Sequence, residues 1–175
     1  SMKKYVYTHC NSNAEDYHIQ TNNARDPFIT CFPTSMINWA KINGLNPDSK
    51  LSKYKQPEDE FDAFIHDDPA MISYVNKLSA QPWVRDYLDK GGDVRELWDV
   101  EVYGINKWLG EDHAKANYNL SIQDIVYEIQ SGRSIVTTGK FCEYSHAVTI
   151  VGFKALSNTT MLDKDVEFSG SNMSF

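Results

Sequence analysis

Apolar side chains recur with helical spacing in the first part of this chain and gather into strand-like runs in the last part. The N-terminal stretch is polar and irregular apart from a short predicted strand over residues 4–8. A helix is then predicted over residues 31–43, because Thr30 suits the N-cap, Pro33 the first turn and Gly44 the position after the last turn. Its apolar positions cover much of the circumference, which predicts a buried helix.

The middle of the chain has the pattern of a series of helices. Residues 57–90 predict two or three acidic, amphipathic helices, and a further helix is predicted over residues 94–109. Ser121, with Asp124 three residues later, resembles a capping box that starts another short helix. Residues 46–120 carry no motif that indicates a function.

β-Branched runs replace the helical spacing towards the C-terminus. Residues 134–138 and 146–153 predict buried strands, and a last short strand is predicted near residues 166–168. Helices followed by strands indicate an α+β fold. No repeat or low-complexity linker divides the sequence, so we expect a single domain over residues 1–175.

Composition limits the classes of function. The chain has 175 residues, of which 41% are hydrophobic, and a formal net charge of -7. This size and composition suit a domain with a sizeable core. Such an acidic chain is a poor candidate for binding nucleic acid or an anionic membrane surface. We see no secretory signal pattern and no apolar run long enough to span a bilayer, so we expect folding in the cytoplasm and no membrane insertion.

Metal and disulfide chemistry is not expected either. The cysteines are too few, and odd in number, for a disulfide framework, and no Cys-x-x-Cys pair indicates a zinc site. The acidic run around His66 fits a helix end and a capped restart at Asp68 better than a calcium loop, since it lacks the turn glycine and the regular oxygen spacing. We predict no metal and no cofactor.

Cys31 lies where a thiol is expected to be reactive. The first turn of a helix has unpaired N–H groups and the positive end of the helix dipole, which both favour the thiolate. A cysteine hydrolase also needs a histidine base and a donor for the developing oxyanion. His146 opens a predicted strand, and the uncharged amide of Gln20 lies 11 residues before Cys31. These residues are the candidate nucleophile, base and oxyanion donor.

Each candidate also has an ordinary structural interpretation. Cys31 alone fits a buried core thiol, His146 a strand-end histidine with a satisfied hydrogen bond, and Gln20 a loop amide. Cys10 and Cys142 are interpreted as free or partly buried thiols.

The remaining aromatic and histidine side chains are assigned mainly to packing and surface. Aromatic residues at helical spacing are typical of a core, and Trp98 or Trp108 is an alternative lining for a groove. Three histidines lie in polar contexts and are predicted at the surface: His9, His18 and His113.

Four short motifs occur in one chain order: QTNN at 20–23, TCFPTS at 30–35, SGRSIV at 131–136 and SHAVTIVG at 145–152. Together they resemble the papain-clan cysteine peptidases similar to the double-glycine leader peptidases of bacteriocin exporters. The resemblance covers about residues 17–45 and 121–153. It implies a papain-like α+β fold, in which a central N-terminal helix carrying Cys31 packs on an antiparallel sheet carrying His146. It also implies that Cys31 is the nucleophile, His146 the general base and Gln20 the oxyanion donor.

The resemblance is incomplete at the third catalytic position. In that family an Asp or Asn, commonly in an Asp-Pro element, orients the histidine, and no Asp-Pro follows His146 here. The candidates are Asp163, Asp165 and Asn172, with Asp165 preferred because it precedes the last predicted strand. A residue beyond Phe175 is the alternative.

The resemblance also implies a substrate class. Free-standing domains of this kind in bacteria and their phages are often lytic enzymes that cut peptide or amide bonds of peptidoglycan. We therefore expect a peptide or a peptidoglycan stem peptide as substrate, with action at the bacterial cell wall. A peptidase or isopeptidase acting on proteins is the second enzymatic interpretation. A degenerate, non-catalytic module that binds a peptide is the alternative outside the enzymes.

Overall fold

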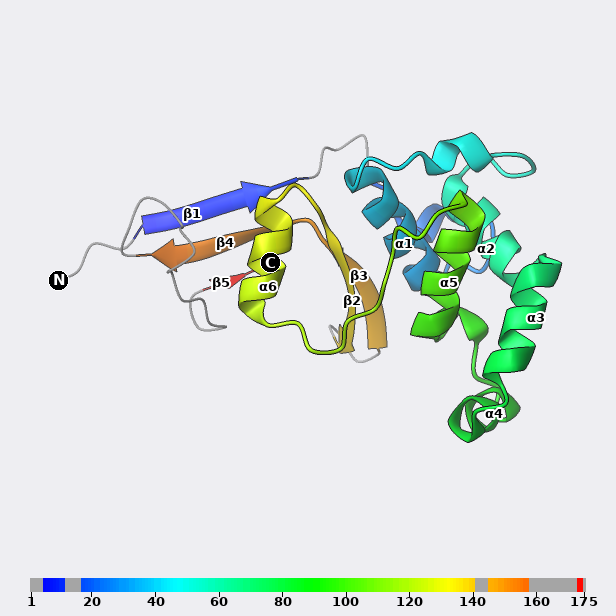
Figure 1. Cartoon of the computed structure of the whole chain (residues 1–175). Helices are drawn as coiled ribbons and strands as arrows, with labels where there is room; N and C mark the ends of the chain where they lie inside the picture. Colours follow the sequence, from blue (N-terminus) through cyan, green and yellow to red (C-terminus); the bar gives the residue numbers. More distant parts are fainter. Residues whose placement is uncertain (1–4, 12–16, 141–144, 158–172, 175) are drawn as a thin grey trace.

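The computed structural model describes residues 5–11, 17–140, 145–157 and 173–174, and within them the fold is mixed α+β, as predicted. The helices are α1 (Cys31–Ile42), α2 (Pro57–Asp67), α3 (Pro69–Leu78), α4 (Pro82–Asp89), α5 (Trp98–Leu109) and α6 (Ile122–Gln130), with short 3-10 turns η2 (Gln20–Asn22), η3 (Pro47–Lys50) and η4 (Val94–Glu96). The strands are β1 (Tyr5–Cys10), β2 (Ile135–Lys140), β3 (Ser145–Ile150), β4 (Gly152–Ser157) and β5 (Met173–Ser174). In Figure 1, α1–α5 gather at one end, the β1–β4–β5 sheet and α6 lie at the other, and the β2–β3 ladder lies between them.

Prolines start three of the helices. Pro57, Pro69 and Pro82 occupy the first turns of α2, α3 and α4. The N–H that proline lacks has no partner within a helix at this position, so its absence costs no hydrogen bond. Asp68 lies between α2 and α3, and its carboxylate accepts a hydrogen bond from the N–H of Ala70 (2.9 Å). The predicted helix end and capped restart are confirmed.

Helix α1 lies in the main hydrophobic core. Ile37 and Ala40 have no exposed surface, and side chains of α2 and α5 such as Phe61 and Ile105 are equally buried. Gly44 follows the helix with φ of +80°, which a glycine adopts without strain. The buried helix predicted from the sequence is confirmed.

The last part of the chain forms two antiparallel ladders where the sequence pattern predicts one strand. β3 pairs with β2, with His146 opposite Gly139, whereas β4 pairs with β1. The change of partner occurs at Val151, whose carbonyl accepts a hydrogen bond from the N–H of Asn11 (2.9 Å). The single strand predicted over residues 146–153 is therefore wrong, because the apolar run is shared between two partners.

The helix predicted over residues 94–109 is also interrupted. It begins as the 3-10 turn η4, where the Asp93 carboxylate accepts a hydrogen bond from the N–H of Arg95 (2.9 Å). Leu97 then adopts an extended conformation with its side chain buried, and α5 starts after it. Burial of Leu97 thus competes with helix continuation and interrupts the helix.

α6 packs on the strands and forms a smaller core. The predicted capping box is confirmed, since the side chains of Ser121 and Asp124 each accept a hydrogen bond from the other residue's N–H. Val126 and Ile129 on its buried face lie against Phe153 of β4. α6 thus covers the start of β4, the strand that continues β3.

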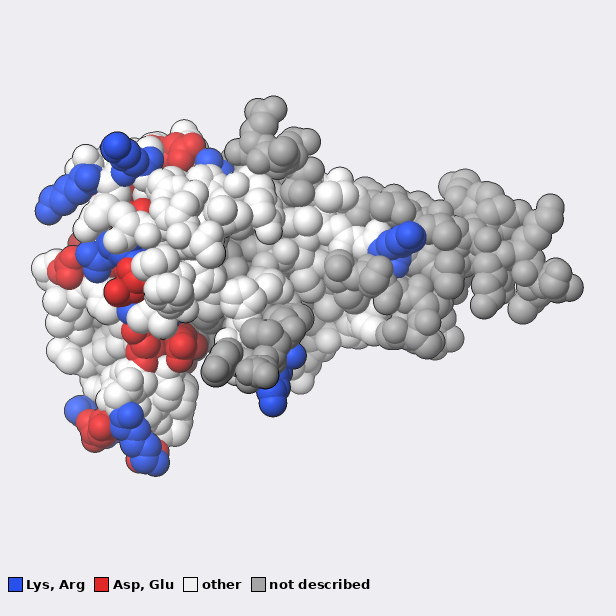
Figure 2. Space-filling view, turned by 180° about the vertical axis from the view of Figure 1, so that it is seen from behind, with Lys and Arg blue, Asp and Glu red and all other residues white. Residues whose placement is uncertain are grey.

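Two surface properties bear on function. In the rear view of Figure 2, charged side chains gather over the helical end of the molecule. Across the described ranges, no helix combines the length and the apolar character needed to cross a membrane.

The strand predicted near residues 166–168 lies outside the described residues.

Candidate active site

Cys31 is the first residue of α1, directly after the N-cap position Thr30. The Thr30 hydroxyl does not cap the helix but donates to the carbonyl of Asp26 (3.0 Å) and accepts from the side-chain amide of Asn23 (2.8 Å). The same amide also donates to Oγ1 of Thr34 (2.9 Å), one turn into the helix. Asn23 therefore fixes the segment after Gln20 to the start of α1.

Helix α1 and strand β3 are joined by two hydrogen bonds. The Ser35 hydroxyl donates to the carbonyl of Ala147 (3.0 Å), and the Thr149 hydroxyl donates to the carbonyl of Ser35 (2.7 Å). Ala147 follows His146 directly, so these bonds bring the histidine to the Cys31-bearing helix. The expected packing of a helix carrying Cys31 on a strand carrying His146 is observed.

The segment that carries Gln20 is held on the same helix. The buried side chain of Asn38 accepts a hydrogen bond from the N–H of His18 (2.9 Å) and donates one to its carbonyl (3.0 Å). The His18 ring lies with Nδ1 2.9 Å from a carboxylate oxygen of the buried Glu58. The prediction of His18 as a surface residue is wrong, because this pair draws the ring against α2.

Three of the four predicted site residues line one pocket. Gln20, Cys31 and His146 enclose a cavity of about 290 Å³ together with neighbouring residues of α1, β3 and the segment before η2. Within the described part of the chain, no hydrogen bond joins the Cys31 thiol to the His146 ring. Asp165, like the alternatives Asp163 and Asn172, lies outside the described residues.

The local environment holds Cys31 in its thiol form. Burial raises the pKa of the Cys31 thiol, the backbone amide groups of Ala147 and Phe32 oppose this rise, and the negative charges of Glu96 and Glu101 add to it. The net direction is upward. This direction runs against the expectation of a thiolate favoured by the helix N-terminus, because burial is the largest influence on the pKa of this thiol.

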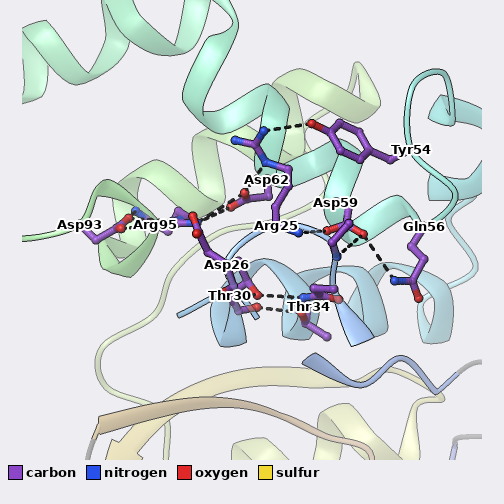
Figure 3. Close-up of polar contacts among 12 residues, drawn as sticks. Arg25, Asp26, Thr30, Thr34, Tyr54, Gln56, Asp59, Asp62, Asp93 and Arg95 are labelled. Carbon is purple, nitrogen blue, oxygen red and sulfur yellow. Dashed lines mark hydrogen bonds and ion pairs between the residues drawn. The ribbon is translucent and has the colours of Figure 1, made fainter. Parts of the chain in front are cut away.

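Charged side chains of α2 hold the loop before Cys31, residues 24–30, which we call the lead loop (Figure 3). The Asp59 carboxylate accepts hydrogen bonds from the backbone N–H groups of Ala24 (3.1 Å) and Arg25 (3.0 Å). The Arg25 guanidinium in turn donates to the buried carboxylate of Asp62 (2.8 Å). The start of the lead loop is thus fixed on α2.

Arg95 holds the middle of the lead loop from the opposite side (Figure 3). Its side chain is only 3% exposed and lies 2.9 Å from Asp26, 3.3 Å from Asp62 and 2.7 Å from Asp93. Asp26 has φ of +42°, a conformation that non-glycine residues rarely adopt. The ion pair with Arg95 and the hydrogen bond from Thr30 stabilise this turn five residues before Cys31.

We use the name lead-loop network for the contacts among six residues: Arg25, Asp26, Asp59, Asp62, Asp93 and Arg95. This network gives a structural role to part of residues 46–120, where the sequence indicated none. Asp59 and Asp62 lie three residues apart and so share a face of α2, which was the one local signal available. Asp59 lies 34 residues from its partner Arg25, and Asp62 lies 33 residues from its partner Arg95. The pairing itself could therefore not be found from local spacing.

The acidic run of α2 is used for hydrogen bonding within the protein. Across the residues that the structure describes, no group of three or more His, Cys, Asp or Glu side chains could hold a metal ion. Glu60, for example, accepts hydrogen bonds from the backbone N–H groups of Ser52, Lys53 and Tyr54.

A second cavity lies against the other face of α1. It measures about 630 Å³, and its lining includes Trp39, Trp98 and Tyr118. The Trp98 ring contacts Phe32 edge-on at a centroid distance of 4.5 Å, and its Nε1 donates to Thr138 (3.3 Å). The predicted alternative of a groove-lining Trp98 is borne out.

No protein-family model, curated protein or solved structure matches this chain.

Proposed function

We propose that this protein is a cysteine hydrolase of peptide or amide bonds with a papain-like arrangement of its catalytic residues. The observation that supports it most is the common pocket of Gln20, Cys31 and His146, in which His146 comes from a distant part of the sequence. Two independent sets of contacts hold this pocket together: Asn38 on the Gln20 side and the Ser35–β3 hydrogen bonds on the His146 side.

The proposed reaction uses each residue in one role. His146 takes the thiol proton as the sulfur of Cys31 attacks the carbonyl carbon, and it then gives this proton to the leaving amine. A water molecule hydrolyses the resulting thioester and restores the thiol. The Gln20 amide and the backbone N–H of Cys31 donate to the oxyanion, and this N–H has no hydrogen-bond partner among the described residues. Because burial raises the pKa of the resting thiol, this proton transfer accompanies the attack.

A peptidoglycan stem peptide is the proposed substrate, and a protein-directed peptidase is the second enzymatic interpretation. The support comes from the resemblance of the motifs around Gln20, Cys31 and His146, together with the acidic chain, which suits a substrate with a free amine.

A non-catalytic peptide-binding module is the competing proposal. Two observations favour it: the raised pKa of the Cys31 thiol and the absence of a hydrogen bond from this thiol to His146 in the described part of the chain. This proposal requires that peptide enters the pocket and leaves uncut.

The deciding experiment measures new primary amines released from purified peptidoglycan and from denatured protein substrates. Cys31→Ala and His146→Ala should each lose at least about 10³-fold of the parent rate, the scale typical of removing a member of a catalytic triad. Cys10→Ala is the matched control, because Cys10 is an exposed cysteine outside the pocket and its loss should leave the rate unchanged.

The same samples separate the two proposals. Amine release that survives in Cys31→Ala would rule out the cysteine mechanism. Binding of stem peptide by the parent and by Cys31→Ala, with no amine released by either, would establish the binding module instead.

A further inference from the structure

Two contacts bring the segment that contains Glu96 close to the segment that contains Cys31. The Arg95 guanidinium lies 2.9 Å from Asp26, and the Trp98 ring lies 4.5 Å from the Phe32 ring. The segment from residue 95 to 98 therefore runs alongside the segment from residue 26 to 32. Glu96 lies within the first segment and Cys31 within the second.

Glu96 is exposed, and one of its two carboxylate oxygens accepts a hydrogen bond within the protein. The Tyr87 hydroxyl donates to one oxygen, Oε2, at 2.8 Å. Burial and this hydrogen bond raise the pKa of Tyr87 to about 12, so the phenol keeps its proton and remains a donor. The other oxygen, Oε1, makes no hydrogen bond to any described residue. It is available to a group that arrives from solvent.

The nearby cations do not neutralise Glu96. Arg25 is paired with Asp62, and Arg95 is paired with Asp26, Asp62 and Asp93. Each guanidinium is thus already matched by carboxylates inside the lead-loop network.

The carboxylates of Glu96 and Glu101 both contribute to the raised pKa of the Cys31 thiol, and they differ in exposure. Glu101 is fully buried, and burial raises its pKa well above its usual range. Glu96 is exposed. Of the two, Glu96 is therefore the carboxylate that faces solvent.

We propose that Glu96 is a specificity-determining residue, which makes the Cys31 site prefer substrates carrying a cationic group, such as a free amine or a lysine side chain, next to the bond that is cut. The preference among substrates rests on the proposed hydrolase function, whereas the charge preference at the thiol does not. A negative charge near the nucleophile concentrates cations at the site and disfavours anions.

The charge preference can be measured without any substrate. A trimethylammonium-ethyl and a sulfonatoethyl methanethiosulfonate both convert a thiolate into a mixed disulfide and release methanesulfinate, but they carry opposite charges. Their rates at Cys31 are read by peptide mapping at low ionic strength and divided by their rates with free cysteine. The corrected cation-to-anion ratio should be about tenfold in the parent, as expected for one nearby charge acting on reagents of opposite sign.

Two variants attribute this ratio to a residue. Glu96→Gln keeps an oxygen that accepts from Tyr87, so the fold should persist by circular dichroism while the ratio falls at least about threefold. Glu111→Gln is the control, since Glu111 is an exposed carboxylate beyond the far end of α5, a helix about 18 Å long. Its ratio should equal that of the parent.

Three results would overturn the proposal: a corrected ratio near one in the parent, an unchanged ratio in Glu96→Gln, or a Cys31 that neither reagent modifies. Peptide pairs that differ only in lysine or acetyl-lysine beside the cleaved bond then test the substrate statement, with a preference for lysine that Glu96→Gln should abolish. If no peptide is cut while the reagent ratio is as expected, the hydrolase proposal fails and the charge preference stands.

Discussion

The lead-loop side and the pocket side of Cys31 are built differently. On the lead-loop side, Arg25 and Arg95 satisfy aspartates from separate elements, and a strained turn at Asp26 is held in place (Figure 3). On the pocket side, the thiol and the imidazole of His146 line one cavity, and within the described residues they make no hydrogen bond to each other.

This difference separates position from reactivity. The backbone around Cys31 is fixed by contacts that are already complete, so the location of the sulfur is set before any ligand binds. The reactive groups still need a change in solvation or geometry to form a thiolate, because burial raises the pKa of the thiol.

The largest effect is expected at Arg95. Arg95→Met removes the charge from a site that is 3% exposed and leaves the buried Asp62 without one of its partners. We expect a loss of about 3–5 kcal/mol in the free energy of unfolding, measured with urea, as is typical of breaking a buried ion pair. Arg133→Met is the matched control, because its pair with Glu128 is largely exposed and its loss should change stability little. Equal losses in both variants would contradict the structural role of the lead-loop network.

A smaller effect is expected at Asn38, on the pocket side. Asn38→Leu removes both hydrogen bonds to the His18 backbone, and we expect a loss of about 2 kcal/mol in stability. Amide exchange over residues 17–20 should also become faster, because this segment loses its attachment to α1. Asn43, at the C-terminal end of α1, accepts a hydrogen bond from the N–H of Ser134. Asn43→Leu removes this acceptor and should leave amide exchange over residues 17–20 unchanged. Unaltered exchange in Asn38→Leu would show that Gln20 is held by other contacts.

Glu101 should make stability depend on pH. Its carboxylate is fully buried and, among the described residues, neither oxygen has a hydrogen-bond partner; burial raises its pKa. A carboxyl with a raised folded-state pKa contributes stability that is present below the unfolded value of about 4.3 and is lost as pH rises through the folded value. Glu101→Leu should therefore be about 1–2 kcal/mol more stable than the parent at pH 8, with a gap that shrinks towards pH 5.

Urea unfolding at both pH values measures this gap. Glu111→Leu, at an exposed carboxylate, should show no such pH dependence. The contradicting result is a stability of Glu101→Leu relative to the parent that is lower at pH 8 than at pH 5. It would mean that the charged carboxylate is stabilised in the folded protein.

The smallest effect concerns titration of the thiol. Alkylation of Cys31 should reach half its maximal rate above the ordinary cysteine value of about 8.5, because burial and the Glu96 and Glu101 charges raise its pKa. His146→Ala should leave this midpoint unchanged in the absence of substrate. A midpoint well below the ordinary value that moves in His146→Ala would show that the resting protein already holds a thiolate–imidazolium pair.

Local signals in the sequence were sufficient for most of the fold. The capping box at Ser121, the capped restart at Asp68 and the β-branched run over residues 134–138 each act over a few residues, and each is found where predicted. The division of the last run into β3 and β4 could not be predicted, because it depends on which strand pairs with each half.

The candidate site divides in the same way. The order of the motifs led to Gln20, Cys31 and His146, which do line one pocket. The direction of the thiol pKa was missed, since burial of Cys31 follows from packing between distant segments. Arg95 was missed for the same reason, as its partner Asp26 lies 69 residues away.

The most direct test of the hydrolase proposal is acylation of the protein by p-nitrophenyl acetate, which needs no knowledge of the natural substrate. We predict a burst of p-nitrophenolate, an acetyl group located on Cys31 by mass spectrometry, and turnover that is lost in His146→Ala while Cys10→Ala resembles the parent. Acetylation that favours Cys10 over Cys31, or turnover that is equal in the parent and His146→Ala, would contradict the account.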